Sequence, residues 1–180
     1  MQGGFRMKNR VLGYLFTLVV YILSIPIASA HGEAESSPLL TNIQIFLISV
    51  SISLVVFFVF RSNNPKKLSA FKPGIFSLAL LSGLVHILLG ISDRILLLGG
   101  VGVLVILASP LLVKMNDTRE RIAHYSLGIL SLVMFIAYFV SNHDIHSILE
   151  DYLGLTAKIA EIGVMVGLVQ HRRSASIQDE

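Results

Sequence analysis

The charged residues divide this sequence into long stretches that contain no Asp, Glu, Lys or Arg. Five such stretches, each 19 to 25 residues long, cover residues 11–32, 36–60, 73–92, 95–113 and 122–143. A sixth apolar stretch, residues 152–169, contains only Lys158 and Glu161 as charged residues. Because a helix rises 1.5 Å per residue, about 20 residues cross the hydrocarbon core of a bilayer. The pattern therefore predicts an all-α, polytopic membrane helix bundle.

The composition supports a membrane protein and excludes several other classes. Only 14% of the 180 residues are charged and 54% are hydrophobic, whereas a soluble domain has about 25% charged residues. The chain has no cysteine, which rules out disulfides, iron–sulfur clusters and thiolate zinc sites. The formal net charge of +3 is spread over short loops that meet anionic lipid, so we expect the bilayer as a partner and no nucleic acid.

The first apolar stretch has the layout of a secretory signal peptide. Three basic residues precede the apolar residues 11–27, and small residues in an A-x-A pattern, Ala28 and Ala30, follow them. This order predicts a signal peptide at residues 1–30 that is cleaved after Ala30. Five transmembrane helices then remain in one domain, residues 31–170, followed by a tail, residues 171–180. The alternative is an uncleaved first helix and six spans in total.

The distribution of basic residues predicts the orientation. We expect helices at about residues 42–60, 74–91, 95–113, 122–140 and 152–169. If the N-terminus is inside and every stretch spans, 12 of the 14 Lys and Arg residues lie in cytoplasmic segments, and only Arg94 and Lys158 do not. Basic residues stay on the cytoplasmic side. We therefore expect a multi-pass protein of the plasma membrane, with the mature N-terminus outside and the C-terminus in the cytoplasm.

Predicted helix 74–91 has small and polar residues on one side. At steps of three or four, this side contains Ala79, Gly83, His86, Gly90 and Asp93. Small residues let a neighbouring helix approach closely, and a histidine inside a span is costly unless it has a partner. His86 is therefore a candidate metal ligand, with Asp93 about 10 Å further along the helix axis as a second one. The alternative is that His86 bonds a neighbouring carbonyl and only fixes packing.

Predicted helix 152–169 contains a deep carboxylate. Glu161 lies about nine residues from the start of the helix, where it needs a partner or a proton. We consider it as a metal ligand, and alternatively as an ion-pair partner of Lys158 at i−3. Gly163 and Gly167 have the GxxxG spacing, with Ala160 alongside, which predicts a helix-packing face.

Further candidate ligands lie in the predicted outer segments. His143, His146 and Glu150 share a face if residues 141–151 are helical. Imidazole and carboxylate groups suit nickel, copper, cobalt or zinc in a site without sulfur; the alternative is a solvated polar loop. After cleavage, His31 would offer both its ring and a terminal amine to copper. The start at residues 31–33, His-Gly-Glu, resembles the mature start of the B subunit of membrane-bound methane and ammonia monooxygenases, although nothing later resembles its cupredoxin domains.

The segment 83–96 resembles the HupE/UreJ family of nickel and cobalt permeases. That family has a helix with the motif H-x-x-x-G-x-D-H followed by an apolar run. His86 and Gly90 match its spacing, whereas Ser92 stands at the family's Asp and Asp93 at its His. Both of these motif positions therefore differ in this chain.

Two further segments are similar to the same family. Residues 123–126, which include His124, resemble its later A-H-S segment, and Glu161 falls where its C-terminal helix often has a glutamate. The predicted signal peptide followed by a histidine-bearing start is also similar. The resemblance covers about a quarter of the chain and implies transport of a divalent metal. Apart from this resemblance, His124 shares one face of its predicted helix with Gly128 and Ser131. Because it is close to Arg121 and the lipid headgroups, we expect an interfacial histidine.

Two functional hypotheses remain, and neither is an enzyme. The first is a permease-like protein that handles Ni, Co, Cu or Zn through an outward-facing His/Asp site. The second is a non-catalytic transmembrane subunit or scaffold, within a homo-oligomer or a larger complex such as a copper monooxygenase. In both hypotheses the polar residues within the spans face other helices rather than lipid. We therefore expect the outer ends of predicted helices 74–91 and 152–169 to converge on one polar site. The candidate metal ligands are His31, His86, Asp93, His143, His146 and Glu161.

Overall fold

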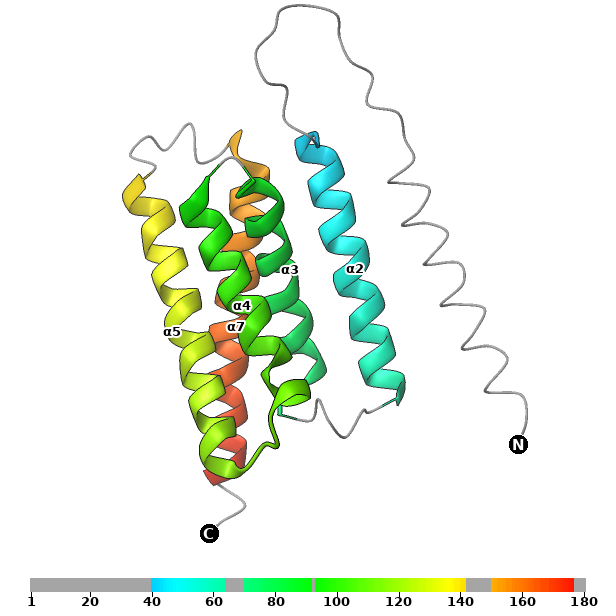
Figure 1. The fold of residues 1–180 in the computed structure, drawn as a ribbon, viewed down its shortest axis with the longest axis vertical. Helices are drawn as coiled ribbons and strands as arrows, with labels where there is room; N and C mark the ends of the chain where they lie inside the picture. Colours follow the sequence, from blue (N-terminus) through cyan, green and yellow to red (C-terminus); the bar gives the residue numbers. More distant parts are fainter. Residues whose placement is uncertain (1–39, 64–69, 92, 142–149, 177–180) are drawn as a thin grey trace, which may run out of the picture.

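The computed structural model describes residues 40–63, 70–91, 93–141 and 150–176, and their regular structure is entirely helical. The helices run up and down side by side (Figure 1). They are α2 (Asn42–Asn63), α3 (Pro73–Leu89), α4 (Arg94–Leu112), α5 (Asp117–Ser141) and α7 (Tyr152–Ser176). The predicted all-α membrane bundle with five helices after residue 31 is thus confirmed for the described residues. The predicted signal peptide, residues 1–30, lies outside them.

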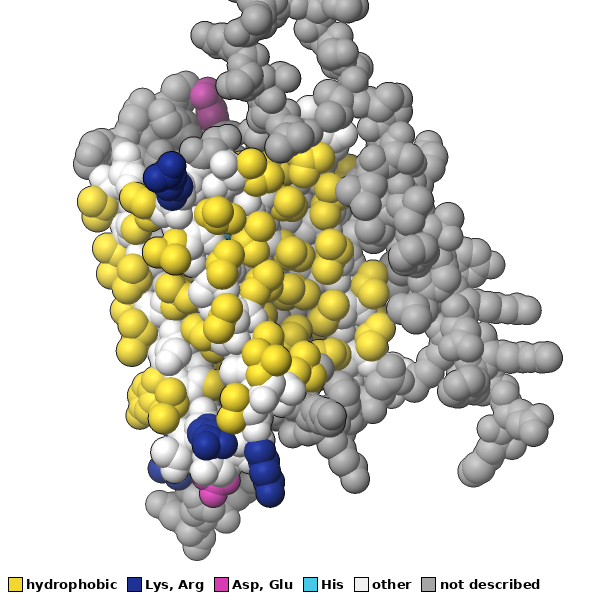
Figure 2. All heavy atoms as spheres, in the orientation of Figure 1, with side chains coloured by type: hydrophobic (Ala, Val, Ile, Leu, Met, Phe, Trp, Pro, Cys, Tyr) yellow, Lys and Arg dark blue, Asp and Glu magenta, His cyan; other side chains and the backbone are white. Residues whose placement is uncertain are grey.

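The surface of the bundle is apolar along most of its length. Four helices are long and apolar enough to cross a membrane, and α3 is a shorter apolar helix of 17 residues. Hydrophobic side chains cover the middle of the face seen in Figure 2, and the charged side chains in view lie toward its two ends. Large side chains such as Ile95 and Leu98 are 80% and 75% exposed. A surface of this kind suits hydrocarbon rather than water, and it indicates a membrane protein.

Helix boundaries follow local capping groups as well as the apolar pattern. Pro73 occupies the first turn of α3, where the amide that proline lacks has no helical partner. Asn116 Oδ1 accepts a hydrogen bond of 2.9 Å from the amide of Arg119 and so caps α5. α5 begins at residue 117 rather than at the predicted 122, and α7 ends at residue 176 rather than at the predicted 169. The added turns are polar, and the apolar pattern indicates only the part of a helix that lies in hydrocarbon.

The short helix α3 is the centre of the bundle. It packs against α2, α4 and α7, while α5 packs against α7 and α4. The main core contains Phe71, Leu107, Leu127 and Val164, each at most 2% exposed. A side chain of α3 also reaches α2 directly, since Ser77 Oγ donates a hydrogen bond of 2.6 Å to the carbonyl of Ser53.

Glycines allow the closest helix contacts in the bundle. A Cβ atom on Gly100 of α4 would lie 2.7 Å from the carbonyl oxygen of Gly83 on α3. The α3 glycine therefore meets α4 rather than α7. The GxxxG face of α7 is a packing face as predicted, because a Cβ on Gly163 would lie 2.7 Å from a methyl of Leu78 on α3.

The two ends of the bundle differ in charge. We call the end where residues 90–93 join α3 to α4 the hairpin end. We call the opposite end the basic end, because it contains the start of α3, the start of α5 and the end of α7. The end of α2 lies there too, and the described basic residues at this end are Arg61, Lys72, Lys114, Arg119, Arg121, Arg172 and Arg173.

Candidate polar site within the bundle

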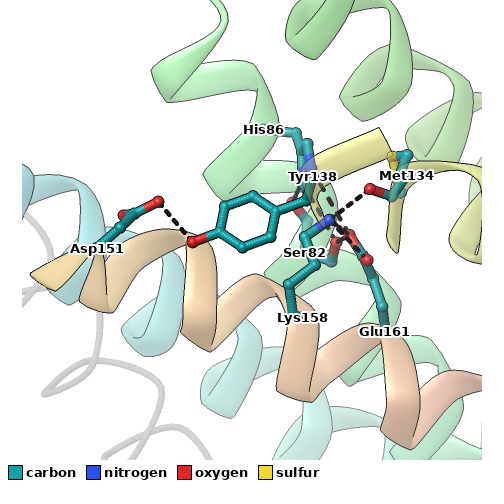
Figure 3. A network of polar contacts seen from close by, with 7 residues as sticks. All are labelled: Ser82, His86, Met134, Tyr138, Asp151, Lys158 and Glu161. Atoms are coloured by element: carbon teal, nitrogen blue, oxygen red, sulfur yellow. Dashed lines mark hydrogen bonds and ion pairs between the residues drawn. The ribbon is translucent and has the colours of Figure 1, made fainter. Parts of the chain in front are cut away.

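A buried polar network joins α3 to α7 toward the hairpin end (Figure 3). Glu161 and Lys158 project from α7 toward Ser82 and His86 of α3, and all four side chains are buried. Glu161 is 0% exposed and Lys158 is 2% exposed. The two helices therefore converge on one polar site. His86 and Glu161 lie together there, as we expect from the free-energy cost of exposing either side chain to lipid.

Glu161 accepts three hydrogen bonds from two side chains. Lys158 Nζ lies 2.8 Å from each carboxylate oxygen, and Ser82 Oγ donates a hydrogen bond of 3.1 Å to Oε1. The third hydrogen of the ammonium is directed to the carbonyl of Met134 on α5, at 2.9 Å. The predicted pairing of Lys158 with Glu161 is confirmed. The opposite charges of the two side chains neutralise each other, and both side chains make hydrogen bonds, as burial of an ion pair requires.

The hydrogen bonds of His86 determine which of its ring nitrogens carries a proton. Nδ1 lies 2.8 Å from the carbonyl oxygen of Ser82. A carbonyl only accepts, so Nδ1 must be the donor, and Nε2 has a lone pair when the ring is neutral. Nε2 lies 3.6 Å from Glu161 Oε1. This distance is too long for a hydrogen bond, so two acceptor atoms face each other across a gap in which a cation or a proton would be favourable.

A pocket of about 400 Å³ opens beside the network at the hairpin end. Its polar lining includes His86 and Lys158, together with Asp93, Tyr138 and Asp151. Tyr138 donates a hydrogen bond of 3.1 Å to Asp151 Oδ2, and Lys158 Nζ lies 5.3 Å from the centre of the Tyr138 ring. The pocket thus places two carboxylates near the buried ion pair.

Asp93 does not join Glu161 in one buried site, contrary to our expectation. Its side chain is exposed, and Oδ1 accepts hydrogen bonds from the amides of Ile95, at 2.8 Å, and Leu96, at 3.5 Å. The first amides of a helix have no partner within the helix, and Asp93 satisfies those of α4. Asp93 therefore caps a helix and borders the pocket. His31, His143 and His146 lie outside the described residues.

Other polar residues of the bundle were not singled out from the sequence. Ser82 precedes His86 by one turn, which is a local signal for its position beside the histidine. Tyr138 and Met134 lie on α5, and no spacing relates that helix to Glu161.

A second cluster at the basic end contains Glu120, His124 and His171, with one candidate ligand atom from each within 4.8 Å of the others. His124 is buried in the bundle, and its Nε2 donates a hydrogen bond of 2.6 Å to the carbonyl of Ala70.

The fold and the buried network together define a helical membrane protein with a polar network inside its bundle. Comparison of the chain with protein-family models, with curated proteins and with solved structures gives no match.

Proposed function

We propose that the chain is a small permease-like membrane protein that handles a divalent transition metal ion. In this proposal His86 Nε2 and Glu161 Oε1 are the ligands inside the bundle, and the pocket at the hairpin end admits the ion. The observation that carries the proposal is the separation of 3.6 Å between these two atoms. Two ligands of a tetrahedral site with bonds of 2.0–2.1 Å lie about 3.3 Å apart, so a small closure would let both contact one ion.

Lys158 has a defined role in this proposal. Its ammonium contacts both oxygens of Glu161 in the absence of a metal, and so supplies the positive charge that the buried carboxylate needs. A divalent ion that binds Glu161 would displace it. Asp151 directly precedes α7, seven residues before Lys158, and lines the same pocket, which gives the displaced ammonium a carboxylate to move toward.

The orientation and the choice of metal belong to the same proposal. The basic end lies in the cytoplasm by the positive-inside rule, so the pocket opens outward from the plasma membrane. His31, His143 and His146 would then be on the outer side, where they would collect the ion before it enters. The resemblance of segment 83–96 to nickel and cobalt permeases favours those two metals, and copper and zinc share the same ligand chemistry.

Metal titration of the purified, untagged protein tests this function. The matched set is wild type, His86→Ala, Glu161→Gln and the control Ser77→Ala, which removes a hydrogen bond between α3 and α2 away from the pocket. We expect the first two variants to bind one ion fewer of nickel, cobalt, copper or zinc than wild type and the control to be unchanged. Equal metal content in all four proteins would rule out His86 and Glu161 as ligands.

A non-catalytic scaffold subunit is the second candidate, and one observation favours it. Both oxygens of Glu161 already have donors within the chain, so the network can serve packing alone. Lys158→Gln separates the two functions. A metal site should bind its ion more tightly once the competing ammonium is gone, whereas a packing network should only lose stability and bind nothing.

A further inference from the structure

The cluster at the basic end combines two helices and three groups that ligate metals. Glu120 and His124 lie one turn apart on α5, and His171 reaches them from the end of α7. One ligand atom from each residue lies within 4.8 Å of the other two. The rings of His124 and His171 meet edge to face, with their centres 5.2 Å apart. Two imidazoles and a carboxylate are a recurrent ligand set for zinc.

The hydrogen bond that His124 makes through Nε2 leaves its Nδ1 able to bind a metal. Nε2 lies 2.6 Å from the carbonyl oxygen of Ala70, and a carbonyl only accepts, so Nε2 carries the proton. The lone pair of the neutral ring is therefore on Nδ1. Histidines that bind metals commonly donate their other N–H to a carbonyl or a carboxylate, which fixes the tautomer and the direction of the ring.

His171 has an unsatisfied nitrogen in the same place. Its Nδ1 is fully buried, and none of the residues that the structure describes makes a hydrogen bond to it. A buried polar atom without a partner is costly and requires an explanation. A metal ion that accepts the lone pair of Nδ1 would remove that cost.

We propose that Glu120, His124 and His171 form a second metal site, of the two-histidine and one-carboxylate type, that takes Zn²⁺ at the basic end. Bonds of 2.0–2.1 Å require ligand atoms about 3.3 Å apart. The present separations are at most 4.8 Å, so no pair of ligand atoms must close by more than about 1.5 Å. A water molecule would complete four ligands. The ion would fasten α5 to α7 and, through the bond from His124 to Ala70, also the residues that precede α3.

This site is independent of the one proposed at His86 and Glu161. Glu161 and His171 are ten residues apart on α7, which places them about 15 Å apart along the axis. The buried side chains of Val164 and Leu168 lie between them on the same helix. Each site can therefore be removed without a direct effect on the ligands of the other.

The test uses the full, untagged chain with the triple change His86→Ala/Lys158→Met/Glu161→Gln. This parent lacks both ligands of the function proposed above and also the charge of Lys158, so that neither failure of that function nor an unpaired buried ammonium affects the result. Zn²⁺ binding is measured by equilibrium dialysis, and Co²⁺ is used as a spectroscopic substitute. We expect one Zn²⁺ per chain and the visible absorption of tetrahedral Co²⁺. Glu120→Gln and His171→Gln should each weaken Zn²⁺ binding by at least about 100-fold.

Asp117→Asn is the matched control, because Asp117 is also an acidic residue in the first turn of α5 but is not in the cluster. It should bind Zn²⁺ as its parent does. If the parent takes up no Zn²⁺ and gives no tetrahedral Co²⁺ spectrum, the proposal is overturned even where a variant fails to fold. An equal loss in Asp117→Asn would overturn it as well, since the effect would then be one of general charge.

Discussion

Lys158 and Glu161 lie one turn apart on α7 and form an ion pair in which Nζ is 2.8 Å from both carboxylate oxygens. Both side chains are buried in the centre of a bundle whose outer surface is apolar. Because one helix supplies both partners, the pair can form as soon as α7 is helical. The remaining bonds, from Ser82 and to Met134, then attach this pair to α3 and α5.

The first prediction concerns this ion pair in the metal-free protein. Lys158→Met leaves a buried carboxylate without its counter-charge and should lower the free energy of unfolding by about 3–5 kcal/mol. The double variant Lys158→Met/Glu161→Gln removes both charges and should recover most of that loss. Thermal unfolding in detergent, arranged as a double-mutant cycle, measures the coupling. Additive effects of the two changes would show that the pair contributes nothing to the fold.

The second prediction concerns the close contact of α3 and α4. Gly100→Ala would place a Cβ atom 2.7 Å from the backbone oxygen of Gly83 and 2.8 Å from the backbone nitrogen of Ile87. Backbone atoms cannot move aside cheaply, so we expect a loss of about 1–3 kcal/mol in unfolding free energy. The control is Gly74→Ala, where no atom lies within 4 Å of the new Cβ. Stability there should stay unchanged or rise by up to about 1 kcal/mol.

The third prediction concerns orientation. The chain contains no cysteine, so single cysteines report their own exposure without background. Ser62→Cys at the end of α2 should be protected from a membrane-impermeant thiol reagent in intact cells, and Ser141→Cys at the end of α5 should react. Permeabilised cells provide the control in which both react. Labelling of Ser62→Cys alone in intact cells would reverse the orientation.

The fourth prediction concerns processing. The mature chain should begin at His31, because Ala28 and Ala30 fit the small-residue positions that signal peptidase requires. Intact-mass measurement of protein isolated from membranes decides this, since the full chain has a mass of 19.7 kDa. A mass equal to that of all 180 residues would exclude both the cleavage and a chelate that uses the amine of His31.

The sequence predicts the positions of the helices well, but it gives less information on which helices pack against each other. Uncharged stretches locate four of the five described helices, and the apolar stretch 152–169, which contains two charged residues, locates the fifth, because bilayer thickness imposes a length on each span. The cost of burying His86 and Glu161 predicts that both face protein, and they meet. Nothing in the spacing indicates that Gly83 faces α4, because a small residue permits contact with any neighbour. The role of Asp93 as a cap depends on where α4 begins, which the apolar pattern locates only to within a few residues.

The central position of α3 has a consequence for biogenesis. Ser82 and His86 enter the membrane with α3, but their partner Glu161 is on α7, the last helix among the described residues, and is synthesised about 75 residues later. Until then α3 can pack only against α2 and α4. A chain that lacks α7 would therefore leave Ser82 and His86 in the bilayer without Glu161. Synthesis of α7 would be the step that gives these polar groups their partner.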